Sequence, residues 1–167
     1  MIGETIPGGT TTAQAVLTGL GVKAKVSSSM PENPTSLKNK IANDALAKLT
    51  STNPFDVVAA VGDPMIPTVA GMLSTASSLT KVILAGGTQM AAVLAFSRIT
   101  GYEKKNVAIG TTSYVVNDNT ANLVDTIKQI DDVPVLSARL ALKDSKIDGL
   151  RAFADGFVKE GVGAGGA

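Results

Sequence analysis

Uniformly apolar runs alternate with helical stripes along this chain, and the alternation predicts a parallel α/β fold. The runs Val82–Leu84, Asn106–Gly110 and Val133–Leu136 are short and almost wholly apolar, as expected of strands covered on both faces. A further short strand is predicted within Val22–Ser29. We therefore expect one domain over residues 1–167, a doubly wound, mainly parallel sheet with helices on both faces, Rossmann-like and three-layered.

Helices are predicted where apolar residues recur three and four positions apart. The expected helices are Ala13–Leu20, Thr35–Leu49, Phe55–Val61, Met65–Leu79, one that begins at the cap Thr88, Asn119–Ile130 and Ile147–Phe157. In the second, the predicted buried stripe is Leu37, Ile41, Leu46 and Leu49. Lys38, Lys40 and Lys48 are then interpreted most simply as solvated charges on the same helix.

The composition narrows the possible partners. The chain is 44% apolar and 17% charged with a net charge of +1, and it contains no run of Lys or Arg. Nucleic acids and anionic membranes are therefore not expected to bind. No apolar run approaches the roughly 20 residues of a membrane span, and no signal peptide is apparent, so the predicted location is the cytoplasm.

The absence of cysteine and histidine limits the possible chemistry. It excludes disulfides, thiolate nucleophiles, imidazole acid/base catalysis and the usual zinc sites. Catalysis must use carboxylates, hydroxyls, amides, lysines or backbone N–H groups, which suit phosphate binding and proton transfer. No metal or cofactor is expected.

Two glycine turns are the first candidate binding elements. Gly86 and Gly87 follow a predicted strand at the sheet edge where open α/β sheets bind ligands, although an ordinary strand-to-helix turn is an equal alternative. Gly8 and Gly9 precede Thr10 at a predicted helix start, where backbone amides can hold a phosphate or carboxylate. That loop lacks the lysine of a P-loop, so a plain helix-entry turn is the favoured alternative.

A third candidate lies after the strand Asn106–Gly110. Gly110, Thr111 and Thr112 would stand at the carboxyl end of that strand, where hydroxyls are well placed for a ligand or simply satisfy the turn. The chain ends on a glycine-rich tail, and Met1 precedes a loop that should follow a strand. Both ends are therefore interpreted as cut from a longer protein.

Several motifs in this order resemble the nicotinate-nucleotide–dimethylbenzimidazole phosphoribosyltransferase family, most closely its archaeal-type branch, over nearly the whole chain. The matching segments are Glu4–Thr11 (ETIPGGTT), Asn39–Lys40, Val61–Pro64, Val82–Thr88 and, most specifically, Glu160–Ala164 (EGVGA). The resemblance implies an enzyme that transfers phosphoribose from nicotinate mononucleotide to a lower-ligand base of the cobamides, releasing nicotinate. The family's habit implies a homodimer.

The resemblance also implies roles for individual residues. Glu160 would be the general base that takes a proton from the incoming base, and Glu4 would lie beside the reacting sugar. Lys40 would hold the phosphate, with Gly8, Gly9, Thr10, Gly110, Thr111 and Thr112 completing the cradle. Gly86, Gly87, Gly161 and Gly163 would let a flat benzimidazole or purine-like base approach the backbone.

Three positions depart from the family pattern. Ile6 replaces the first glycine of the loop, Ala85 replaces an Asp at the end of the central strand, and Asp63–Met65 does not clearly reproduce an acidic residue. These changes bear on which base is accepted, or on whether this reaction is the physiological one. The family's chains are also considerably longer, so the isolated chain is expected to be weakly active or inactive. The alternatives are a non-catalytic nucleotide-binding or regulatory module and an oligomerising fragment.

Overall fold

The computed structural model describes residues 1–157, 159 and 162–167. It contains one four-stranded sheet whose neighbouring strands are all parallel, in the order β1-β2-β3-β4. The strands are β1 (Ile2–Gly3), β2 (Val82–Ala85), β3 (Val107–Thr112) and β4 (Val135–Ala138). The predicted parallel α/β fold class is confirmed.

The helices occupy the connections between the strands and the end of the chain. Between β1 and β2 lie α1 (Gly9–Gly19), α2 (Thr35–Leu46), α3 (Pro54–Val61) and α4 (Met65–Leu79). Between β2 and β4 lie α5 (Thr88–Thr100), the 3₁₀ turn η1 (Lys104–Asn106), α6 (Ser113–Val116) and α7 (Leu123–Ile130). After β4 come η2 (Leu142–Asp144), α8 (Asp148–Ala154) and α9 (Val162–Gly165). Among the described residues, no helix combines the length and apolarity that a membrane crossing requires.

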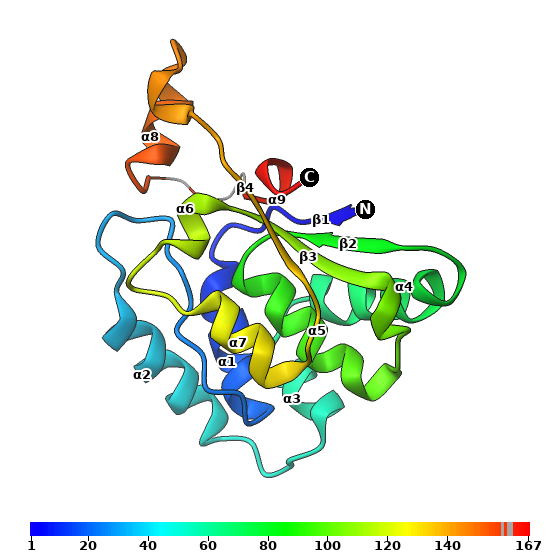
Figure 1. Ribbon diagram of the computed structural model, residues 1–167. Coiled ribbons are helices and arrows are strands. Elements are labelled where there is room, and N and C mark those ends of the chain that lie inside the picture. Colours follow the sequence, from blue (N-terminus) through cyan, green and yellow to red (C-terminus); the bar gives the residue numbers. More distant parts are fainter. Residues whose placement is uncertain (158, 160–161) are drawn as a thin grey trace.

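The winding of the sheet differs from the doubly wound order expected from the sequence. Each successive strand is added at the same edge, and right-handed crossovers then place their helices on one face. Figure 1 shows α1, α5 and α7 together on that face, with α9 on the opposite one. The end of the chain packs closely on this second face. A Cβ atom on Gly110 would lie 2.3 Å from the Gly166 carbonyl oxygen.

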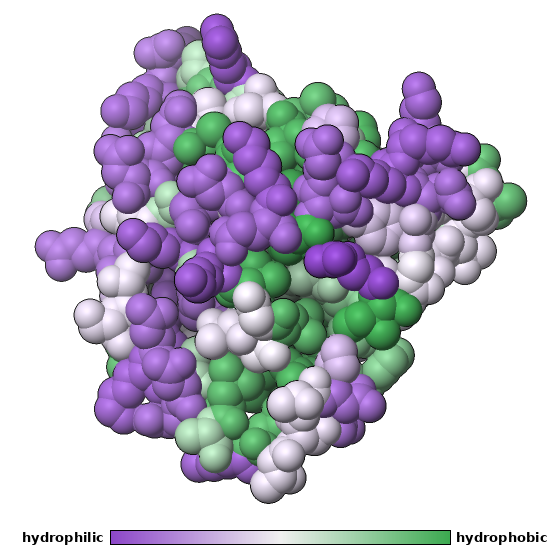
Figure 2. Space-filling view, turned by 60° about the horizontal axis from the view of Figure 1, so that its bottom comes forward, coloured by the Kyte–Doolittle hydropathy of each residue, from purple (hydrophilic) through white to green (hydrophobic). Residues whose placement is uncertain are grey.

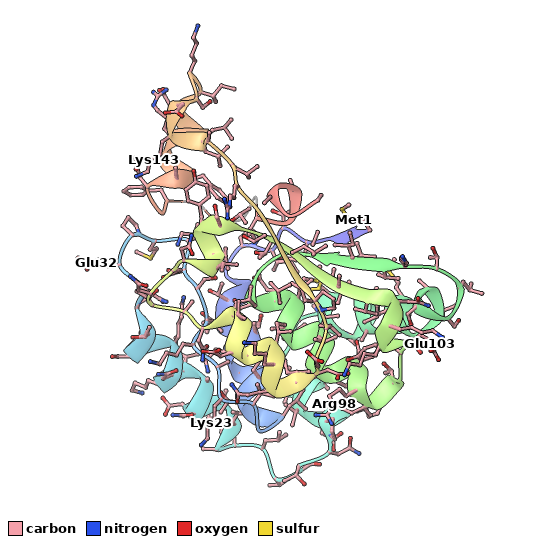
Figure 3. The ribbon with its side chains drawn as sticks, in the orientation of Figure 1. Met1, Lys23, Glu32, Arg98, Glu103 and Lys143 are labelled. Carbon is pink, nitrogen blue, oxygen red and sulfur yellow. The ribbon has the colours of Figure 1, made fainter. Side chains whose placement is uncertain are left out.

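The core lies between the sheet and the helices of the first face. Helix α5 is at its centre, because every residue from Thr88 to Ser97 is buried. Its small residues allow it to pack closely against α4 and α1, while the Phe96 ring contacts Phe55 of α3 edge to face. Charged side chains such as Lys23 and Glu103 lie at the periphery (Figure 3), and polar groups surround the apolar surface visible in Figure 2.

The strand predicted within Val22–Ser29 is absent from the described structure. The segment is extended, but its backbone groups form hydrogen bonds with side chains of helix α7 and of Asn122, the residue that precedes α7. They do not pair with a neighbouring strand. Lys25 donates its N–H to the side chain of Asn122 at 2.6 Å, and Lys23 donates to Gln129 at 3.2 Å. These side chains satisfy backbone groups that a sheet partner would otherwise pair.

Helix α2 buries a different face from the one predicted. The side chains of Leu37 and Ile41 are 56% and 46% exposed, whereas Lys38 is only 6% exposed and Ala42 is buried. The predicted buried stripe is therefore wrong at Leu37 and Ile41, although Leu46 and Leu49 are partly buried, and the interpretation of Lys38 as a solvated charge is wrong. The reason is tertiary packing, because α2 contacts α1 and α3 through the side that carries Lys38 and Ala42.

Candidate functional site

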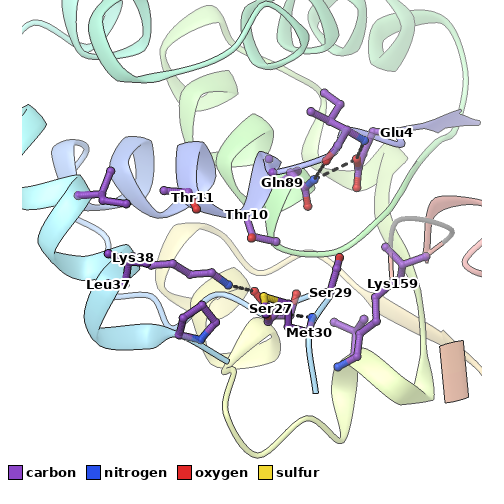
Figure 4. A pocket seen from close by; sticks show the side chains of 18 residues that line it. Glu4, Thr10, Thr11, Ser27, Ser29, Met30, Leu37, Lys38, Gln89 and Lys159 are labelled. Atoms are coloured by element: carbon purple, nitrogen blue, oxygen red, sulfur yellow. Dashed lines mark hydrogen bonds between the residues drawn. The ribbon is translucent and has the colours of Figure 1, made fainter. Parts of the chain in front are cut away.

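A cavity of about 300 Å³ opens at the carboxyl end of the sheet (Figure 4). It is bounded by the β1–α1 loop, the segment that follows α1, helix α2, the start of α5 and the end of the chain. Its lining residues are Glu4, Ile6, Gly8, Gly9, Thr10, Thr11, Ser27, Ser28, Ser29, Met30, Pro34, Leu37, Lys38, Ile41, Gln89, Val115, Lys159 and Val162. This is the edge at which parallel α/β sheets bind ligands.

Glu4 brings a buried carboxylate to this cavity. It directly follows β1, and its Oε2 accepts hydrogen bonds from the Ile6 N–H and from Gln89 Nε2, both at 3.2 Å. A Cβ on Gly86 would lie 3.0 Å from Glu4 Oε1, so the turn after β2 leaves room for the carboxylate only because Gly86 has no side chain. A carboxylate fixed in this way can stabilise positive charge that develops on a ligand.

The start of helix α1 forms another wall of the cavity. Gly8 adopts a left-handed conformation with φ of 75° and stands at the N-cap position, where it has no side chain to cap the helix. A Cβ on Gly9 would lie 2.6 Å from Gln89 Nε2, so Gly9 gives that amide space to reach Glu4. The N–H groups of Gly9 and Thr11 donate to the carbonyl oxygens of Ile6 and Gly8, but the positive end of the helix dipole still favours an anion beside Thr10 and Thr11.

Lys38 is a buried cation that lines the cavity, and the sequence pattern did not predict this position. Its Nζ donates to the Ser27 carbonyl oxygen at 2.7 Å and to Asn33 Oδ1 at 2.9 Å, which leaves one of its three N–H groups for a ligand. None of the described ion pairs includes Lys38. Burial lowers the pKa of Lys38 to about 8, although the nearby Asp118 carboxylate opposes this shift.

A second lysine of the cavity belongs to the same polar network. Lys159 Nζ lies 3.2 Å from Asp118 Oδ2, and Thr120 donates to Asp118 through both its N–H and its hydroxyl. Asn33 in turn donates to the Thr120 hydroxyl at 3.0 Å and accepts from Lys38. Burial opposes ionisation of Asp118, but the bonds from Thr120 and the charge of Lys159 outweigh it and lower the pKa of Asp118. Asp118 thus pairs with Lys159, while Lys38 is joined to the same network through Asn33 and Thr120.

The structure brings several of the predicted site residues together. Glu4, Gly8, Gly9 and Thr10 all line the cavity. Three of the substrate-pocket glycines, Gly86, Gly87 and Gly163, lie beside it. Gly86 adjoins Glu4, a Cβ on Gly87 would lie 3.7 Å from Val162, and a Cβ on Gly163 would lie 2.5 Å from the Glu4 carbonyl oxygen.

Lys40, the predicted phosphate ligand, does not reach the cavity. It lies on the exposed side of α2, where it forms an ion pair with Asp44 one turn further along. Lys38, two residues earlier, faces inward instead. Helical geometry separates them, because positions two apart point about 200° from each other around the axis.

Gly110, Thr111 and Thr112 are buried in the sheet and do not line the cavity. Gly110 is needed for packing, since Gly166 lies directly against it on the second face. The Thr111 and Thr112 hydroxyls have no hydrogen-bond partner among the described residues. Their role as phosphate ligands stays a prediction from the sequence.

Glu160 and Gly161, the predicted general base and its neighbouring glycine, lie outside the described residues. The residues on either side of them in the sequence, Lys159 and Val162, both line the cavity. The roles of Glu160 and Gly161 therefore stay predictions.

The fold and the cavity define a parallel α/β protein whose ligand cavity, at the carboxyl edge of the sheet, is lined among the described residues by two lysines and the buried carboxylate of Glu4. No protein-family model matches the chain. It is 47% identical over 175 residues to a UPF0284 protein of Methanocaldococcus jannaschii, 48% over 166 residues to one of Archaeoglobus fulgidus, and 45% over 174 residues to one of Microcystis aeruginosa. These matches cover 99% of the chain in each case and 50%, 47% and 48% of the relatives.

The chain belongs to the UPF0284 family, and it spans about half the length of the relatives it matches.

Proposed function

We propose that the protein transfers phosphoribose from nicotinate mononucleotide to a cobamide lower-ligand base such as dimethylbenzimidazole. The products would be the α-ribotide and nicotinate. The observation that carries the proposal is that one cavity holds a buried carboxylate, Glu4, together with two features that attract anions, Lys38 and the start of helix α1. A nucleotide needs the carboxylate for its sugar and the anion-attracting features for its phosphate.

The reaction exchanges one carbon–nitrogen bond for another at C1′ of the ribose. The bond to the pyridinium nitrogen of nicotinate breaks, and its electron pair returns to that nitrogen, so the leaving group needs no acid. The unprotonated ring nitrogen of the incoming benzimidazole forms the new bond with its lone pair, and the proton on its other ring nitrogen passes to a general base, for which we propose Glu160. Glu4 would stabilise the positive charge that develops at C1′.

The geometry of α2 changes the proposed phosphate ligand from Lys40 to Lys38. Lys38 is buried, lines the cavity and has no carboxylate partner among the described ion pairs, whereas Lys40 is exposed and paired with Asp44. The positive end of the α1 dipole, beside Thr10 and Thr11, would attract the same phosphate from across the cavity. Both contacts suit a phosphate monoester.

Base-dependent release of nicotinate by the full-length protein tests this proposal. We expect release from nicotinate mononucleotide to require an added base, and Glu160→Gln and Glu4→Gln each to lower the rate by about 10²- to 10³-fold. Glu32→Gln, at an exposed carboxylate before α2, is the matched control and should leave the rate unchanged.

Two outcomes would contradict the transferase. If both glutamate variants release nicotinate at the wild-type rate, neither carboxylate is catalytic. If no base supports release while nicotinate mononucleotide binds the wild type and both variants equally, the protein is a non-catalytic nucleotide-binding module.

A further inference from the structure

The end of the cavity formed by helix α2 is apolar, and its side chains are exposed. Met30, Pro34, Leu37 and Ile41 line this end. Met30, Leu37 and Ile41 are also among the large apolar residues that the described structure leaves exposed. Figure 4 places Leu37 next to Lys38 on α2, across the cavity from Glu4.

This apolar end is part of a concave site rather than a surface stripe on a solvated helix. Leu37 and Ile41 are one helical turn apart, so their side chains form a continuous wall. Lys38 lies between them in the sequence, faces the interior and lines the same cavity. The apolar wall would therefore lie within one helical turn of an anion bound to Lys38.

The charges and the apolar wall together indicate the chemical class of the ligand. Lys159 is paired with Asp118, whereas Lys38 is held by Ser27 and Asn33 and takes part in none of the described ion pairs, so its ammonium can bind an anionic group. A ligand would shield these exposed apolar side chains from water only if it also carries an apolar part. A small inorganic anion satisfies the first condition but not the second.

We infer that the α2 end of the cavity is a subsite for an aromatic ring carried by the same ligand whose anionic group binds Lys38. The inference rests on the proposed use of the cavity for a nucleotide-like ligand and adds where one of its rings lies. Leu37 and Ile41 would then determine which rings are accepted, because they form the wall against which the ring packs.

The test compares phenyl phosphate with inorganic phosphate, which differ by one aromatic ring. We expect the full-length wild type to bind phenyl phosphate at least about tenfold more tightly, as measured by NMR titration, because the ring buries apolar area against Leu37 and Ile41. The double variant Leu37→Gln/Ile41→Gln should keep its affinity for inorganic phosphate and lose this tenfold preference. Leu79→Gln, at an exposed leucine that ends α4 away from the cavity, should keep the preference.

The possible failures have different meanings. Equal binding of both anions by the wild type would overturn the ring subsite and leave the phosphate site intact. Binding of neither anion would overturn the subsite and also the phosphate site on which the proposed function depends. If the double variant keeps the preference but changes from dimer to monomer in light scattering, the apolar wall is an interface between two copies, and the inference is wrong.

Discussion

Replacing Gly110 by alanine is expected to displace the carboxyl-terminal segment from the second face of the sheet. The new Cβ would lie 2.3 Å from the Gly166 carbonyl oxygen and 2.8 Å from Ile83 Cγ2. The first of these atoms belongs to the backbone, so no side-chain rotation can relieve the clash. We expect a loss of about 1–3 kcal/mol in the free energy of unfolding, measured with urea. Because Lys159 and Val162 line the cavity, ligand affinity should fall as well.

Gly71→Ala is the matched control for this substitution. Gly71 lies on the exposed side of α4, and a Cβ added there meets nothing within 4 Å. Alanine should therefore stabilise the protein by about 0.5–1 kcal/mol, because it favours the helix. Trypsin cleavage after Lys159 gives a second measurement, which should accelerate only in Gly110→Ala. Wild-type stability and cleavage rate in Gly110→Ala would show that the close packing of Gly110 and Gly166 is not required.

Replacing Lys38 by methionine is expected to weaken binding of nicotinate mononucleotide about a hundredfold. The substitution keeps the length and apolar stem of the side chain and removes a buried charge that has no carboxylate partner among the described ion pairs. A charge-assisted hydrogen bond to phosphate in such a place contributes about 1.5–3 kcal/mol, which corresponds to roughly tenfold to more than a hundredfold. Calorimetric titration of both proteins measures the difference.

Lys40→Met, on the exposed side of the same helix, is the control and should bind like the wild type. Because burial lowers the pKa of Lys38 to about 8, its ammonium is lost as the pH rises above that value. Affinity for the phosphate should therefore decline above about pH 8 in the wild type and in Lys40→Met, but this decline should be absent from Lys38→Met. Loss of affinity in Lys40→Met rather than Lys38→Met would restore the assignment made from the sequence.

The elements that could be predicted from the sequence have local signals. Val82–Leu84 and Asn106–Gly110 are uniformly apolar, and both correspond to central strands in the structure. The glycine pair at Gly86 follows β2 directly and the pair at Gly8 begins helix α1, and the parallel order then brings both turns to one edge. Glu4 reaches the cavity for the same reason, since it follows the first strand directly.

The elements that could not be predicted depend on contacts between distant segments. On α2 the apolar stripe of Leu37 and Ile41 favours the wrong buried face, because packing against α1 and α3 turns Lys38 inward instead. No local pattern distinguishes Lys38 from Lys40. Likewise, Gly110 meets Gly166 only in the folded chain, so its packing role has no signal in the sequence around it.

A crystal structure of the full-length protein with nicotinate mononucleotide bound would locate the ligand. We expect its phosphate to lie about 3 Å from Lys38 Nζ and beside the first amides of α1, with C1′ of the ribose facing the carboxylate of Glu4. A nucleotide bound elsewhere, with its phosphate at Lys40 or outside the cavity and no contact to Glu4, would contradict the proposed site.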